Sequence, residues 1–195
     1  MTFEGLDGSG KTTQARLLAE RLSQDGEVVA TREPGGTPLG ERIRQVLLHG
    51  EDVSPWAEAA LFAAARAELV AQVIRPALDR GAAVVCDRYI DSSLAYQGIA
   101  RGLGLERVLE LNLHATGGVL PDRTYLLLVD PQVAVGRMSP SRDRIEREDE
   151  DFRAGVDRAY RELAEFFPNR ITTIDGSRPP DEIGREILDG LRQPS

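Results

Sequence analysis

The sequence has few residues of several kinds, and each scarcity narrows the possible classes of protein. It contains one cysteine among 195 residues, so no disulfide can form within the chain, and a cytoplasmic, reducing location is expected. No apolar stretch approaches the roughly 20 residues that a membrane helix needs, and no signal segment opens the chain. We therefore expect neither a membrane anchor nor secretion.

Lysine is nearly absent: Lys11 is the only one, so 24 − 1 = 23 of the basic residues are arginines. The 32 acidic residues give a net charge of 24 − 32 = −8. Because a chain with this charge does not attract polyanions at long range, we expect no nucleic-acid or membrane-surface partner. An anionic small molecule must be bound by local groups.

Short runs rich in β-forming residues alternate with helical patterns along the chain. Strands are expected at residues 1–4, 28–33, 82–87, 124–130 and 171–175, and helices at residues 11–23, 55–80, 105–115, 149–167 and 180–191. This alternation predicts an α/β fold in a single domain, residues 1–195, with a parallel sheet flanked by helices on both faces. Dense alternating charge over residues 136–151 predicts an exposed, mobile flap. The tail 193–195 is expected to be frayed.

A glycine-rich turn joins the first expected strand to the first expected helix. Its residues are Gly5, Leu6, Asp7, Gly8, Ser9, Gly10, Lys11, Thr12 and Thr13. They satisfy the P-loop pattern G-x-x-x-x-G-K-[ST], in which backbone N–H groups and the helix N-terminus hold phosphates. We expect Lys11 to reach the β- and γ-phosphates of ATP and Thr12 to bind Mg²⁺. The alternative is a turn without a ligand, which the position of the only lysine disfavours.

Asp87 and Arg88 follow the apolar run 82–86 at the end of an expected central strand. A P-loop protein needs a second acid near Mg²⁺, and Asp87 is the best candidate; the alternative is an aspartate that starts a loop or caps a helix. Arg88 lies where α/β sheets bind ligands and can bridge donor and acceptor phosphates. A conventional G protein is excluded, because its N-K-x-D motif needs a second lysine.

The chain resembles bacterial thymidylate kinases in five segments, which are FEGLDGSGKTT, TREPGGTPLGERIR, LFAAARAEL, CDRYIDSSLAYQG and SRDRIEREDEDF. The resemblance covers nearly the whole chain. It implies the P-loop NTPase fold of nucleoside monophosphate kinases, with a five-stranded parallel sheet and a short mobile lid. It also implies a homodimer that transfers a phosphoryl group from ATP to dTMP with Mg²⁺, giving ADP and dTDP.

The resemblance also assigns residues to a thymine pocket. Phe62 would stack on the base, and Arg66 would donate to its exocyclic oxygen. The residues alone favour a core phenylalanine beside a solvated arginine. The inward stripe of the same helix is expected at Trp56, Ala60, Ala63, Ala67 and Ile74.

Four polar or aromatic residues would complete the pocket, namely Ser92, Ser93, Tyr96 and Gln97. By resemblance, Ser93 and Gln97 lie near the thymine edge and Tyr96 lies against the sugar. From the residues alone, Asp91 or Ser92 caps a short helix beside a buried tyrosine.

By resemblance, Asp7 contacts the 3′-hydroxyl of the nucleotide. Arg32 and Arg44 contact the dTMP phosphate, and Glu33 and Pro34 shape the loop that follows the second strand. Without the resemblance, both arginines read as ordinary surface residues.

The last group is basic and belongs to the expected lid. Family members without an arginine in the P-loop place basic residues in the lid, and the candidates here are Arg137, Arg142 and Arg144. We prefer Arg142 for the contact with the transferring phosphoryl group and assign Arg137 to the ATP site. A solvated, charge-balanced face is the alternative. The expected catalytic residues are therefore Lys11, Asp87, Arg88 and Arg142.

Two other functions stay open at this stage. One is a kinase for a different nucleoside monophosphate, which a pocket without Phe62, Tyr96 and Gln97 would indicate. The other is a P-loop regulator that hydrolyses ATP slowly and needs a partner.

Overall fold

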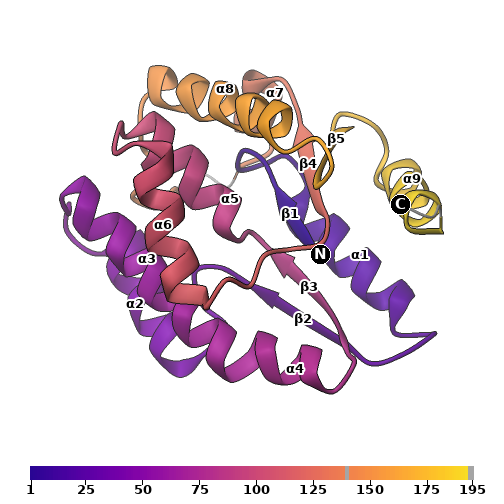
Figure 1. Cartoon of the computed structure of the whole chain (residues 1–195). Coiled ribbons are helices and arrows are strands. Elements are labelled where there is room, and N and C mark those ends of the chain that lie inside the picture. Colours follow the sequence, from indigo (N-terminus) through magenta and orange to yellow (C-terminus); the bar gives the residue numbers. More distant parts are fainter. Residues whose placement is uncertain (139–140, 193–195) are drawn as a thin grey trace.

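The computed structural model of the chain describes residues 1–138 and 141–192. Within these residues five parallel strands form one sheet in the order β2-β3-β1-β4-β5 (Figure 1). The strands are β1 (Thr2–Glu4), β2 (Val28–Arg32), β3 (Ala83–Asp87), β4 (Thr124–Leu128) and β5 (Ile171–Asp175). The α-helices are α1 (Lys11–Leu22), α2 (Pro38–His49), α3 (Pro55–Leu69), α4 (Arg75–Asp79), α5 (Ile90–Ser93), α6 (Leu105–Thr116), α7 (Pro131–Gly136), α8 (Glu150–Phe166) and α9 (Pro180–Arg192). Two π-helical segments, Val70–Ile74 and Leu94–Ala100, continue α3 and α5.

Alternate residues of the strands face opposite sides of the sheet, and each side packs against its own helices. Phe3, Val85 and Leu127 pack with α1 and α9 on one side. Cys86 and Leu126 pack on the other side with α3, α6 and α8. Figure 1 shows α1 and α9 together on one side of the strands, away from α3, α6 and α8. The predicted parallel sheet with helices on both faces is confirmed.

Two helices were not expected from periodicity, although their starts carry capping signals. Thr37 accepts a hydrogen bond from the backbone N–H of Gly40 (3.0 Å), and Pro38 begins α2. Asp130 accepts from the backbone N–H of Gln132 (2.8 Å) at the start of α7. Both starts therefore use standard N-cap chemistry.

The expected inward stripe of α3 is wrong at its first two positions. Trp56 is 45% exposed and Ala60 is exposed. The buried residues of this helix include Ala59, Ala63 and Arg66 instead. Because Arg66 lies inside the molecule, the buried face is rotated relative to one predicted from apolar residues alone.

The segment between α7 and α8 is attached to the body of the protein at Arg144. Its backbone N–H donates to the carbonyl of Leu48 (2.9 Å), and its Nε donates to the carbonyl of Leu47 (2.8 Å). Ile145 packs on the cluster that α2 forms with α3. Residues 139–140 of the expected flap and the tail 193–195 lie outside the described residues. No helix in the described part of the chain is long and apolar enough to cross a membrane.

Candidate active site

A cleft of about 860 Å³ runs along the edge of the sheet where the parallel strands end. The turn after β1 contributes residues 7–10, and the loop after β2 contributes Arg32, Glu33 and Pro34. Asp87 and Arg88 come from the end of β3. Ligands of α/β proteins bind at this edge, so the topology brings the expected site residues together.

The glycines of the turn after β1 are required by its backbone shape. Gly5, Gly8 and Gly10 have φ angles of 134°, 83° and 98°. A Cβ at Gly5 would collide with the carbonyl oxygen of Leu127, and a Cβ at Gly8 with that of Ala134. No side chain caps the N-terminus of α1. Its free N–H groups and the helix dipole therefore favour an anion here.

Lys11 is 5% exposed and lies at the floor of the cleft. Its Nζ donates to the carbonyl of Leu6 (2.7 Å) and lies 3.7 Å from Oδ1 of Asp7. Burial, together with the positive charge of Arg88, lowers the pKa of Lys11 to about 8. A phosphate would offset that burial, because it supplies negative charge to the ammonium group.

Thr12 and Asp87 are held against each other across the turn. The Thr12 hydroxyl donates to Oδ2 of Asp87 (2.5 Å), whereas Oδ1 of Asp87 is buried and has no hydrogen-bond partner among the described residues. An unpaired carboxylate oxygen beside a hydroxyl is a suitable donor set for Mg²⁺. The two residues thus fit the metal that the P-loop pattern predicts.

Arg88 adopts a left-handed backbone conformation, with φ of 68°, which is rare for residues other than glycine. Its backbone N–H donates to the carbonyl of Phe3 (3.0 Å), and its Nη2 donates to Oδ1 of Asp7 (2.5 Å). Although burial opposes ionisation of Asp7, the cations of Arg88 and Lys11 lower its pKa to about 2. The Arg88 guanidinium is thereby fixed at the meeting point of the P-loop and β3.

Two arginines lie at the end of the cleft beside the loop after β2. Arg32 is paired with Oε1 of Glu41 (3.0 Å), and Nη1 of Arg44 donates to the carbonyl of Pro34 (2.9 Å). Both line the cleft. The Glu33–Pro34 peptide bond between them is cis. Arg32 and Arg44 give this end of the cleft two cations that a phosphate could bind.

The other residues assigned to the base also line the cleft, and these are Phe62, Ser92, Ser93, Tyr96 and Gln97. Gln97 is oriented by α3, because its Nε2 donates to Oε1 of Glu58 (2.9 Å). The expected cap at Asp91 or Ser92 is wrong. The helix begins at Ile90, and Asp91 points away to form an ion pair with Arg170 (2.6 Å).

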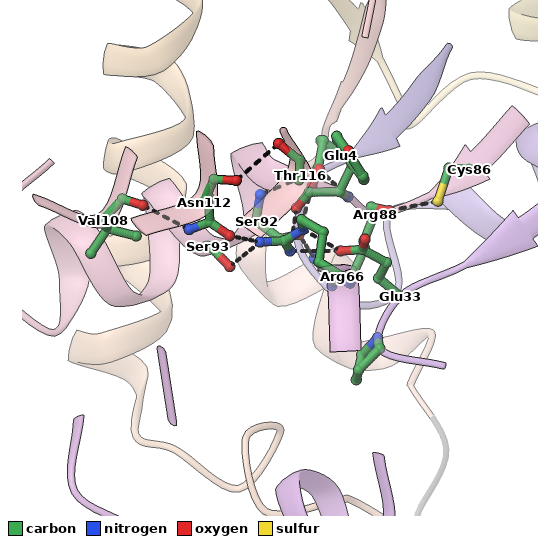
Figure 2. Close-up of polar contacts among 12 residues, drawn as sticks. Glu4, Glu33, Arg66, Cys86, Arg88, Ser92, Ser93, Val108, Asn112 and Thr116 are labelled. Atoms are coloured by element: carbon green, nitrogen blue, oxygen red, sulfur yellow. Dashed lines mark hydrogen bonds and ion pairs between the residues drawn. The ribbon is translucent and has the colours of Figure 1, made fainter. Parts of the chain in front are cut away.

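Arg66 does not line the cleft, contrary to its expected contact with the base. It is 1% exposed. Its Nε donates to Oε2 of Glu33 (2.8 Å), its Nη1 to Ser93 Oγ (3.0 Å) and to Asn112, and its Nη2 to the Tyr89 carbonyl (3.0 Å) (Figure 2). Nη2 also lies 2.6 Å from Oε2 of Glu33. Each of the three guanidinium nitrogens therefore donates at least one hydrogen bond to an acceptor of the protein.

The three lid arginines have different surroundings. Arg137 lines the cleft, and its Nη1 donates to the carbonyl of Gly176 (2.9 Å). Arg142 is exposed and is not part of the cleft lining. Arg144 is buried, and its Nη2 donates to Oε2 of Glu58 (2.7 Å). The cleft thus includes one of the three, and it is not the preferred one.

Sequence reasoning missed two acids beside the cleft. Glu4 and Glu58 are both buried and accept hydrogen bonds from residues that line the cleft. Glu4 had a detectable signal, since it is an acid at the end of a short strand whose other residues, Thr2 and Phe3, are uncharged. Glu58 had none, because an acid in the first turn of a helix is a common exposed feature.

Residues 3–187 match the family model described as thymidylate kinase. The chain belongs to the thymidylate kinase family. It is 51% identical to a thymidylate kinase of Pelotomaculum thermopropionicum, over 96% of this chain and 90% of the relative. It is 47% identical to one of Bifidobacterium longum, over 99% of this chain and 97% of that protein.

The fold of the family is also seen in a solved structure. The crystal structure of thymidylate kinase from Ehrlichia chaffeensis superposes with a TM-score of 0.84 at 34% sequence identity, and the match covers 98% of this chain and 97% of that one. The similarity therefore extends over nearly the whole chain.

Proposed function

We propose that the chain transfers the γ-phosphoryl group of ATP to dTMP and so produces ADP and dTDP for dTTP synthesis. One observation carries the proposal. A single cleft contains the P-loop lysine and Arg88, and it also contains Phe62, Tyr96 and Gln97. A nucleotide donor and a nucleotide acceptor can therefore meet in one place, as phosphoryl transfer requires.

The donor phosphates would be held by the P-loop. Its residues from Gly5 to Gly10 shape the turn, and Lys11, Thr12 and Thr13 begin α1. In the reaction, an oxygen of the dTMP phosphate forms a bond to the γ-phosphorus, while the bond from that phosphorus to the β,γ-bridging oxygen breaks. Lys11 and Arg88 neutralise the charge on the oxygens involved.

Thr12 and Asp87 would hold Mg²⁺. The metal, when bound, supplies positive charge to the phosphate oxygens of the donor. No protein base is needed, because the acceptor phosphate is already ionised near neutral pH.

The acceptor would lie between two groups of residues. Arg32 and Arg44 would bind the dTMP phosphate, and Asp7 would accept from the 3′-hydroxyl. Phe62 would stack on thymine, while Ser93 and Gln97 would contact its polar edge. Tyr96 and Ser92 line the cleft beside them.

Arg66 has a different role in this proposal from the one expected by resemblance. All three nitrogens of its guanidinium bind protein acceptors, so it would act behind the pocket. It joins Glu33, next to the phosphate end, to Ser93, next to the base. The guanidinium would fix the separation of the two ends of the acceptor site.

We further expect Arg142 and Arg137 to act on the phosphates from the lid. Arg137 already lines the cleft. Arg142 would have to approach from the surface when substrates bind. We also expect a cytoplasmic homodimer with no nucleic-acid or membrane partner, as the composition and the family indicate.

The proposal is tested by measuring ADP release from Mg·ATP with dTMP, dUMP, dCMP, dGMP, AMP or no acceptor. We expect dTMP to be strongly preferred, and Arg88→Ala to reduce that turnover by about 10²-fold or more. Arg16→Ala is the matched control, because Arg16 is an exposed arginine paired with Glu20 on α1. It should leave the rate unchanged.

Two outcomes would replace the proposal. Turnover with a different nucleotide alone would make the chain a kinase for that acceptor. Equal ADP release without any acceptor would indicate a nucleotide-hydrolysing regulator.

A further inference from the structure

Glu4 occupies an unusual place for a charged residue. It is the last residue of the central strand β1, and its side chain is completely buried. Its Oε1 accepts from the backbone N–H groups of Tyr89 (2.7 Å) and Ser92 (3.3 Å). One oxygen of this carboxylate therefore fixes the backbone that directly follows Arg88.

The other oxygen binds two hydroxyl groups that also contact Arg88. Oε2 of Glu4 accepts from Ser92 Oγ (2.6 Å) and from the hydroxyl of Tyr160 (2.9 Å). Nη1 of Arg88 donates to the same two hydroxyl oxygens, Ser92 Oγ at 3.0 Å and the Tyr160 hydroxyl at 3.1 Å. Figure 2 shows Glu4, Ser92 and Arg88 next to the Arg66 cluster, which is Arg66 with its partners Glu33, Ser93 and Asn112.

The direction of these hydrogen bonds follows from counting protons. Each hydroxyl has one proton and accepts with its lone pairs. Nη1 of Arg88 has only protons to offer, so neither hydroxyl proton can point at it. The two hydroxyls lie 3.0 Å apart, so one can donate to the other, but the chain of donors must still end on Glu4.

We propose that Glu4 is a positioning residue for Arg88: its carboxylate takes the hydroxyl protons of Ser92 and Tyr160, so that both oxygens present lone pairs to the guanidinium. This inference rests on the proposed function of Arg88 in phosphoryl transfer. It adds a residue that does not touch the substrates but determines whether Arg88 points into the cleft.

The substitution Glu4→Gln tests the direction of the bonds with little change in shape. The glutamine oxygen must stay on the backbone N–H groups of Tyr89 and Ser92, so the amide NH₂ faces the two hydroxyls. Each hydroxyl then accepts from the amide. One hydroxyl can still donate to the other, but the last hydroxyl proton no longer ends on a carboxylate and turns toward Arg88. The guanidinium thereby loses an acceptor and is repelled.

Protonation of Glu4 would have a similar effect, because a protonated carboxyl donates a proton where the carboxylate accepts one. Burial and the negative charge of Asp91 raise the pKa of Glu4 to about 7, against the opposing effects of Arg88, Ser92 and Tyr89. The ionisable groups that face it from the surrounding elements are Lys11, Arg66, Cys86, Arg88, Asp91, Tyr96, Tyr160 and Arg170. The kcat should therefore fall as the pH decreases through this range.

The experiment is a double-mutant cycle measured with Mg·ATP and dTMP at pH 8. We expect Glu4→Gln to lower kcat by about 10- to 10²-fold, as a displaced catalytic group does, with small changes in both KM values. In the Ser92→Ala/Tyr160→Phe background no hydroxyl remains to be reversed, so adding Glu4→Gln should change kcat by less than about 2-fold. Equal losses in the two backgrounds, or no loss in the single variant, would overturn the proposal.

The pH profile supplies a second readout that a purely structural role would not move. In wild type, kcat should decrease at low pH for two reasons: protonation of Glu4 and protonation of the substrate phosphates. Glu4→Gln should remove the first decrease (the protein limb), while the second remains in all variants. Asp91→Asn should move the protein limb to lower pH, because it removes the charge that raises the Glu4 pKa. An unchanged limb in both variants would contradict the inference.

A third readout does not depend on turnover. Crystal structures of wild type and Glu4→Gln should show Nη1 of Arg88 leaving Ser92 and Tyr160 in the variant, and an unmoved guanidinium would refute the inference. If Glu4→Gln does not fold, as judged by urea unfolding, the Asp91→Asn profile decides. A wild-type protein that does not phosphorylate dTMP would refute the proposed function, and the crystal structures would still decide the role of Glu4.

Discussion

Arg66 is an arginine that is buried among acceptors from four different elements. Its contacts reach Glu33 after β2, Tyr89 after β3, Ser93 in α5 and Asn112 in α6. Removing one partner of a buried ion pair leaves the other charge without compensation, which costs more than the pair itself contributes. Arg66 is therefore a point where the stability of the protein and the positions of Glu33 and Ser93, which line the cleft, depend on the same side chain.

We expect Arg66→Leu to lower the free energy of unfolding by about 3–5 kcal/mol, because the buried Glu33 carboxyl would lose its partner. Urea denaturation followed by circular dichroism measures this change. Arg16→Ala is the control, since its exposed pair with Glu20 should contribute about 0–1 kcal/mol. Equal losses in the two variants would show that the Arg66 cluster does not stabilise the fold in this way.

Glu58 provides a pH-dependent prediction at the same scale. Burial by itself would raise the pKa of Glu58, but hydrogen bonds from Gln97, Arg144 and Arg101 lower it below the ordinary value of 4.5. Its contribution to stability is therefore present above pH 4.5 and is lost as the pH falls through the lowered pKa of the folded state.

We expect Glu58→Gln to reduce the free energy of unfolding at pH 7 by about 1–3 kcal/mol, since charged hydrogen bonds are replaced. The difference from wild type should shrink below pH 4.5. Urea titrations at pH 7, 5 and 4 measure it. A difference that stays constant over this range would mean that Glu58 is not the titrating group.

At the scale of elements, the P-loop and the strands could be predicted because their signals are local. The glycine spacing, the following lysine and the β-rich runs each occupy a few consecutive residues, and the structure places them where expected. The buried role of Arg66 could not be predicted, because it depends on acceptors 23 to 46 positions away in the sequence. Arginine reads as exposed whenever such partners are unknown.

The lid is the element where sequence and structure differ most. The expectation singled out Arg142, whereas the structure places Arg137 in the cleft and uses Arg144 to attach the segment to Glu58. The reason is that the three arginines of the segment have similar sequence neighbours. They differ only in the residues that each one contacts in the folded protein.

Arginine substitutions in the lid separate the two assignments. If Arg142 contacts the transferring phosphoryl group, Arg142→Ala should lower kcat by about 10²-fold with little effect on the KM for ATP. Arg137→Ala should act mainly on the KM for ATP. Steady-state kinetics of the two variants, with the exposed Arg161→Ala as control, measures the split. The reverse pattern would move the catalytic contact to Arg137.

At the scale of the whole molecule, the strand order places β1 between β3 and β4. The P-loop therefore lies at the centre of the edge that borders the cleft, and the residues that we propose for the acceptor lie to the β3 side of it. Sequence alone could predict the alternation of strands and helices. The order of strands depends on pairing between distant segments, which local patterns do not encode.

The expected homodimer can be tested on the outer face of α3. Trp56 is 45% exposed, and Ala60 and Ala64 on the same helix are exposed as well. If this face packs against a second copy, Ala60→Arg should place an unpaired charge in the contact and shift the molecular mass toward the monomer. Light scattering coupled to size-exclusion chromatography measures the mass. A dimer that is unaffected by this change would place the contact elsewhere.

The nucleotide cleft also contains the only primary amine among the side chains. Lys11 is the sole lysine of the chain, belongs to the P-loop and is 5% exposed. Reagents that acylate lysine side chains therefore have no surface lysine to consume them, and the extent of side-chain acylation counts the molecules in which Lys11 is accessible. The same property means that any modification of a lysine side chain in this protein falls on the P-loop and is expected to inactivate it.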